Sequence, residues 1–276
     1  MRLVTLANLV PFLGAAALFL SAPPATADVL TFATFTSVSP IKNIRFVNSG
    51  TSPSRVDDAQ IYTTSTATAD SAGATKVYFS FLQTGLSSFV NNVVADYTLT
   101  ASVAKGDTAS SFAGYVIQPI VSGTMSFKST SAIFLTGPDF TTMTIPAGAN
   151  LLTVKFVTGI LGNKNGTKST LSGSTASDAF VEFTSDFLNF DDVTNADIST
   201  TFSAMSNQLQ IASAAASGNN SVSSFRATAG GQFSSDPAPI VMGLVPEPVS
   251  WVMMITGFAM LGIAIRNRAR TVPLAL

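Results

Sequence analysis

The acidic residues carry most of the chemistry that this chain could perform, because its sequence contains neither histidine nor cysteine. Their absence removes Ser-His-Asp and Cys-His catalysis, imidazole and thiolate metal sites, and disulfides. Carboxylate chemistry remains. The largest local concentration of acids comprises Asp178, Glu182, Asp186, Asp191, Asp192 and Asp197.

Calcium is the first ligand that such a group of acids suggests, because Ca²⁺ binds carboxylate and carbonyl oxygens. The candidate ligands are Glu182, Asp186, Asp191 and Asp192. However, the Asp-x-Asn/Asp-x-Asn/Asp-Gly loop is missing, and acids at these spacings on strands usually face solvent. The sequence therefore favours a protein without a resident metal or other cofactor.

Glycoside hydrolysis is the second possibility, because it needs two carboxyl groups facing each other across a cleft. Glu182 with Asp186 or Asp191 is the candidate pair that contains a glutamate. Asp57 and Asp58 form a weaker candidate, since adjacent residues of a strand point to opposite faces. Neither pair lies in a recognisable catalytic motif, so we expect the protein not to be an enzyme.

The composition also limits the partners. Charged residues make up 11% of the 276-residue chain, and the formal net charge is −1. Nucleic-acid binding depends on a concentrated positive field. We therefore expect no nucleic-acid partner.

The middle of the chain has the alternation of apolar and polar residues that is typical of half-buried strands. Residues 76–84, 95–105 and 151–159 show it most clearly, and turn residues such as Gly and Asn separate the segments. Further strands are expected at 30–38, 42–48, 59–66, 113–121, 123–128, 131–136, 179–184, 201–212 and 222–229.

Residues 28–235 are thus expected to form one all-β body, an antiparallel β-sandwich with a jelly roll as one variant. The chain's 21 phenylalanines supply the core. The segment 176–197 carries phenylalanines at helical spacing, but the β-propensity of its aromatics favours a strand followed by a loop. Long loops are expected at 160–178 and 213–224, and a flexible stalk at 236–245.

The N-terminus, residues 1–27, has the pattern of a signal peptide. Arg2 precedes an apolar stretch that closes on Ala25-Thr26-Ala27, which fits cleavage by signal peptidase before Asp28. A permanent membrane helix is the alternative. Pro11 and the Pro23-Pro24 pair interrupt that helix.

The C-terminus has the pattern of a membrane helix with a basic end. Residues 249–265 carry no charge and would make a helix of about 26 Å, close to the thickness of the hydrocarbon core. Three arginines follow and are expected to stay cytoplasmic, which leaves the body on the other side of the inner membrane. A short tail, 271–276, ends the chain.

This C-terminal region resembles the PEP-CTERM sorting signal, in its tryptophan-containing variant. The residues that carry the resemblance are Pro246, Glu247, Pro248, Trp251, Gly257, Phe258, Arg266, Arg268 and Arg270. The resemblance covers residues 246–270 and implies a Gram-negative bacterium that produces exopolysaccharide. It also implies an exosortase, a membrane transpeptidase that recognises the motif and processes the protein for release or attachment at the cell surface.

Three functions follow as hypotheses. The leading one is an exported, non-enzymatic envelope or biofilm-matrix protein with a structural or adhesive body and with exopolysaccharide as its candidate partner. The second is a glycan-binding or glycan-processing module delivered by the same signal, which a cleft holding Glu182 and another carboxylate would favour. The third is a membrane-tethered protein in which the Pro-Glu-Pro sequence is coincidental.

Overall fold

The computed structural model describes residues 29–50, 57–136, 142–212 and 220–241, together with Ile255, Thr256, Phe258 and Met260. The expected signal peptide, its cleavage site at Ala25 and Ala27, and the short tail 271–276 lie outside the described residues. So does the expected sorting signal, apart from the four residues just named.

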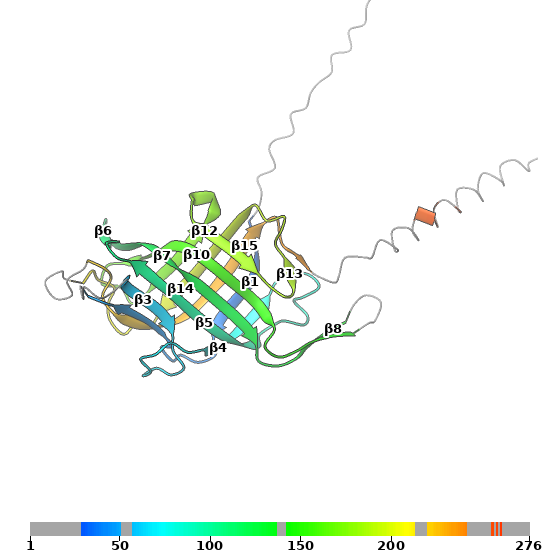
Figure 1. The fold of residues 1–276 in the computed structure, drawn as a ribbon, viewed down its shortest axis with the longest axis horizontal. Coiled ribbons are helices and arrows are strands. Elements are labelled where there is room, and N and C mark those ends of the chain that lie inside the picture. Colours follow the sequence, from blue (N-terminus) through cyan, green and yellow to red (C-terminus); the bar gives the residue numbers. More distant parts are fainter. Residues whose placement is uncertain are drawn as a thin grey trace, which may run out of the picture.

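The described chain is built almost entirely of strands (Figure 1). The first eight are β1 (Leu30–Ser37), β2 (Ile44–Asn48), β3 (Asp57–Thr63), β4 (Thr75–Phe81), β5 (Val93–Ala104), β6 (Ser110–Phe112), β7 (Tyr115–Ser129) and β8 (Ile133–Thr136). The remaining elements are β9 (Thr142–Ile145), β10 (Asn150–Asn163), β11 (Ser169–Ser174), the 3₁₀ turn η1 (Thr175–Ser177), β12 (Phe180–Thr184), β13 (Leu188–Asn189), β14 (Asn195–Ser203), β15 (Phe225–Asp236) and β16 (Ile240–Val241).

The main sheet contains 12 strands and closes on itself. Strands β1, β4, β5, β7, β10, β11, β14 and β15 pair in this order, and β15 pairs back with β1. Strands β3 and β2 make a second link between β5 and β15. These ladders are all antiparallel, so the expected antiparallel all-β fold is confirmed. Opposite parts of the circuit pack on one core as in a sandwich, but hydrogen bonds join them into a single sheet.

Phenylalanine fills the core, as the composition predicts. Phe127 on β7 is fully buried, and its ring lies 4.9 Å from Phe35, 5.2 Å from Phe79, 4.8 Å from Tyr97 and 5.5 Å from Phe233, measured between ring centroids. Strands β7 and β15 lie on opposite parts of the circuit. The contact between Phe127 and Phe233 therefore spans the core, and edge-to-face geometry adds to the apolar burial.

The segment with ambiguous spacing forms a strand followed by a loop, as predicted. Strand β12 pairs with β10, and its alternation leaves Phe180 exposed while Phe183 is buried. The Phe183 ring lies 5.1 Å from that of Phe32 on β1. In this way β12 adds its inner face to the core.

The prediction of a long loop at 160–178 is wrong. Strand β10 continues to Asn163, and β11 and η1 occupy most of the rest. Strand β11 pairs with β10 on one side and β14 on the other, so its Ser- and Gly-rich sequence is held by two neighbouring strands. Of the second expected loop, 213–219 lie outside the described residues.

The chain stays attached to the body beyond the point where a stalk was expected to begin. Strand β15 runs through Asp236, whose carbonyl accepts a hydrogen bond from the Thr194 amide at 2.9 Å. Strand β16 then pairs with β13. Any stalk therefore begins after Val241.

The four described residues near the C-terminus, Ile255, Thr256, Phe258 and Met260, are helical. Within the described part of the chain, no helix has both the length and the apolar character needed to cross a bilayer.

Candidate functional site

Glu182 lies on the open surface of β12. Its carboxylate forms an ion pair with Lys155, its neighbour on β10, with 3.3 Å between Nζ and Oε2. Both side chains are about half exposed, so the pair contributes little to stability. This carboxylate is therefore open to solvent on one side and paired with lysine on the other.

Two of the other calcium candidates accept hydrogen bonds from other parts of the chain or from a neighbouring side chain. Asp186 accepts a hydrogen bond from the Asn150 amide at 2.7 Å. Asp191 accepts one from the Asn189 side chain at 3.0 Å, and its own amide donates to the same side chain. Asp192 is exposed. Among the described residues, no group of three or more acids is placed to hold a metal ion.

The side chains of Asp57 and Asp58 lie on opposite faces of β3, as strand alternation predicts. Asp58 is buried, and its carboxylate accepts a hydrogen bond from the Gly106 amide at 2.8 Å. Asp57 is half-buried and lines a surface groove. The two carboxylates therefore do not face a common substrate.

Among the open grooves on the described surface, three have volumes of about 650, 430 and 410 Å³. The first lies over β1, β14 and β15, and its lining mixes apolar residues with hydroxylated ones such as Ser37, Thr201 and Thr228. The second contains Asp197 as its one acid, and the third contains Asp57 and Asp70. Glu182 lines none of the three.

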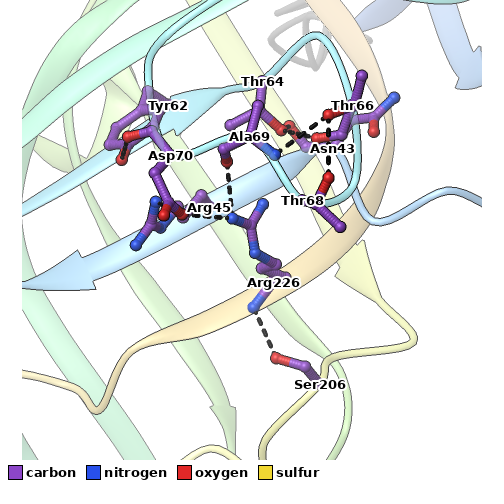
Figure 2. Close-up of polar contacts among 10 residues, drawn as sticks. All are labelled: Asn43, Arg45, Tyr62, Thr64, Thr66, Thr68, Ala69, Asp70, Ser206 and Arg226. Carbon is purple, nitrogen blue, oxygen red and sulfur yellow. Dashed lines mark hydrogen bonds and ion pairs between the residues drawn. The ribbon is translucent and has the colours of Figure 1, made fainter.

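A charged cluster that the sequence reasoning missed adjoins the third groove (Figure 2). Arg45 on β2 and Arg226 on β15 are directly opposite partners in the antiparallel ladder. Tyr62 on β3 is in turn the partner of Arg45, so these three side chains form one row across three strands. Like charges opposite each other are destabilising in a sheet.

Asp70 offsets this repulsion from a loop above the row. Its Oδ1 atom accepts from both guanidinium groups, from Nη1 of Arg45 and from Nη2 of Arg226, the latter at 2.9 Å. The loop backbone is held as well, because Arg226 donates to the Ala69 carbonyl at 2.7 Å and the Tyr62 hydroxyl to the Asp70 carbonyl at 2.9 Å. Figure 2 shows the loop placed over both arginines.

No family model, curated protein or solved structure that was compared with the chain matches it. Arg45, Arg226 and Asp70 form the most concentrated charged group described above.

Sequence reasoning missed this cluster because its members are far apart in the chain. Arg45 and Arg226 meet only through the pairing of β2 with β15. Neither arginine belongs to a motif. The one local signal is the acid Asp70 in a loop that otherwise consists of small and hydroxylated residues.

Tyr97 is the one group whose acidity the fold shifts clearly within the described chain. It is fully buried among aromatic rings, and burial raises the pKa of its hydroxyl above the ordinary tyrosine range. The hydroxyl has no hydrogen-bond partner in the described structure. It is therefore a neutral core group rather than an acid or base for catalysis.

Proposed function

We propose that this protein is an exported, non-enzymatic component of the cell envelope or extracellular matrix, sorted by a PEP-CTERM-like C-terminal signal. Signal peptidase removes residues 1–27 during export. The helix at 249–265 then anchors the chain transiently in the inner membrane until an exosortase processes it at Pro246-Glu247-Pro248. The β-sheet body has a structural or adhesive role in an exopolysaccharide or biofilm matrix.

The observation that carries this proposal is the exposure of the apolar helical residues near the C-terminus. Ile255, Phe258 and Met260 are 66%, 69% and 67% exposed. Large apolar side chains gathered on one helical segment require a nonpolar environment. A membrane would supply it, and the arginines that follow fit the cytoplasmic side.

The placement of the acids supports a structural body over a glycan-processing one. Glu182 is ion-paired on open surface, outside the three grooves. Asp186 accepts a hydrogen bond from the Asn150 amide at the start of β10, and Asp191 is held in a local turn with Asn189. The glycan-binding alternative keeps one supporting feature, the groove over β1, β14 and β15, whose lining includes several hydroxyl groups.

The test is the intact mass and membrane fractionation of the protein from its native host. Glu247→Ala is the informative variant, and Glu182→Ala is the matched control because these are the chain's two glutamates. We expect the wild type and Glu182→Ala to lose the residues after the motif, and any added mass to identify the attachment. Glu247→Ala should keep its tail and stay in the membrane. A retained tail in all three proteins would mean that the helix is a simple anchor.

A further inference from the structure

The Arg45–Arg226 pair has more positive charge and more donors than Asp70 satisfies. Two guanidinium groups carry up to ten N–H donors between them, and together with one carboxylate they leave a local excess of one positive charge. Arg226 Nη1 is buried without a hydrogen-bond partner in the described structure. A buried donor without a partner in a native fold requires an explanation, such as an absent water or ion.

Asp70 covers this pair from the solvent side. Its side chain is 75% exposed, whereas those of Arg45 and Arg226 are 24% and 21% exposed. Ion pairs with an exposed member contribute little stability, because water competes for the charges. The carboxylate of Asp70 is thus the most easily displaced member of the cluster.

Displacement requires little movement of the loop itself. The Gly73 amide donates to the Thr63 carbonyl at 2.9 Å, and Arg226 and Tyr62 hold the backbone carbonyls of Ala69 and Asp70. Rotation of the Asp70 side chain would release the two guanidinium nitrogens that its Oδ1 atom contacts, Nη1 of Arg45 and Nη2 of Arg226, while the loop backbone stays in place. The planar fork of a guanidinium group matches the geometry of a carboxylate.

The third groove indicates what kind of ligand could supply a carboxylate in place of that of Asp70. It has a volume of about 410 Å³, begins at Tyr62 and Asp70, and continues over Gln60, Ser102 and Ser122. Amide and hydroxyl groups suit a hydroxylated ligand. Asp57 also lines the groove, five residues before Tyr62 on β3, which corresponds to about 16 Å along a strand. Its negative charge would repel a second carboxylate of the ligand at that point.

We propose that Arg45 and Arg226 bind a carboxylate of an acidic polysaccharide in which charged and neutral sugars alternate. Asp70 occupies the site in the free protein, and the ligand displaces it. The neighbouring sugars lie in the groove beside Tyr62. That this polymer belongs to the extracellular matrix rests on the proposed function, whereas the site itself does not.

The experiment measures binding of the purified full-length chain, in detergent micelles, to hyaluronan as the alternating acidic probe. Asp70→Asn removes the competing charge and keeps a polar side chain over the arginines. If Asp70 leaves the site about one tenth of the time, its removal should raise the apparent affinity about tenfold. Asp96→Asn is the matched control, because it breaks another exposed ion pair, with Lys76, and changes the net charge equally.

Further variants separate this site from a general charge effect. Arg45→Gln should weaken the binding of the wild type, and adding Arg226→Gln to Asp70→Asn should abolish the gain. An equal gain in Asp96→Asn, or a gain that survives the loss of Arg226, would overturn the proposal. Circular dichroism and thermal unfolding of each variant confirm that the compared proteins are folded.

Two other polymers test the class of ligand. Dextran, which is neutral, should show no difference between Asp70→Asn and the wild type. Tighter binding to polyglutamate than to hyaluronan would overturn the assignment to a polysaccharide and indicate an acidic peptide. These results are independent of tail processing, so a failure of the sorting proposal and a failure of this site are distinguishable.

Discussion

Phe127→Ala should be among the most damaging single substitutions in the body. The Phe127 side chain is fully buried and contacts four aromatic rings, one of them on the opposite part of the circuit. Removing a buried phenylalanine ring costs about 3–5 kcal/mol, from lost burial and the cavity left behind. Because Phe127 contacts four rings, we expect its loss to lie toward the upper end of this range. For a body of this size, a loss of about 4 kcal/mol lowers the Tm by roughly 8–16 °C.

Urea unfolding followed by circular dichroism measures this loss, with Phe134→Ala as the control. Phe134 lies on the β8–β9 hairpin that projects from the body (Figure 1), and it is 60% exposed. Its removal should change stability by about 0.5 kcal/mol or less. A loss below about 1.5 kcal/mol for Phe127→Ala, or equal losses for both variants, would refute the view that the aromatic cluster joins the two sides of the sheet.

Two further substitutions test the close packing and the buried hydroxyl. Gly123→Ala should destabilise the body by about 1–3 kcal/mol or more, because the added Cβ would lie 2.2 Å from the Ala101 Cβ and 2.4 Å from the Thr100 carbonyl oxygen. Adding Ala101→Gly should restore only part of this loss in urea unfolding, since the second contact is with backbone; full recovery would contradict the geometry. Tyr97→Phe should be neutral or stabilising near pH 7, because it removes an unpaired buried hydroxyl. The raised pKa of Tyr97 keeps its proton bound in the folded state, so wild-type stability should fall by about 1.4 kcal/mol per pH unit above about pH 10. In Tyr97→Phe this part of the alkaline slope should disappear, and an unchanged slope would exclude Tyr97 as its source.

The strands with clear alternation could be predicted from the sequence, and those that depend on their neighbours could not. Strands β4, β5 and β10 each have an apolar face that is evident in the residues alone. The region around Gly123, in contrast, is predicted as two strands, at 113–121 and 123–128, with the glycine at the start of the second. The structure has one continuous β7, in which this glycine permits the close approach of β5. A glycine that is needed for packing across strands looks the same in a sequence as one that ends a strand.

The candidate site was less predictable than the fold. The acids that are neighbours in the sequence, such as Asp191 and Asp192, do not converge on a common ligand. The arginines that do converge are brought together by a pairing between the second strand and the fifteenth. Long-range register decides such a site, and residue types and local spacing carry no information about it.

The pairing of β15 also determines how the body would respond to a mechanical load. Leu30, at the start of β1, pairs with Ser235 near the end of β15, so the chain enters and leaves the sheet at the same end. A pull on a tethered tail would first detach the two residues of β16 from β13. It would then act along β15, which is bonded to β1 on one side and to β14 on the other. Many hydrogen bonds would be strained together rather than broken one at a time, so β16 would yield early and the body would stay folded.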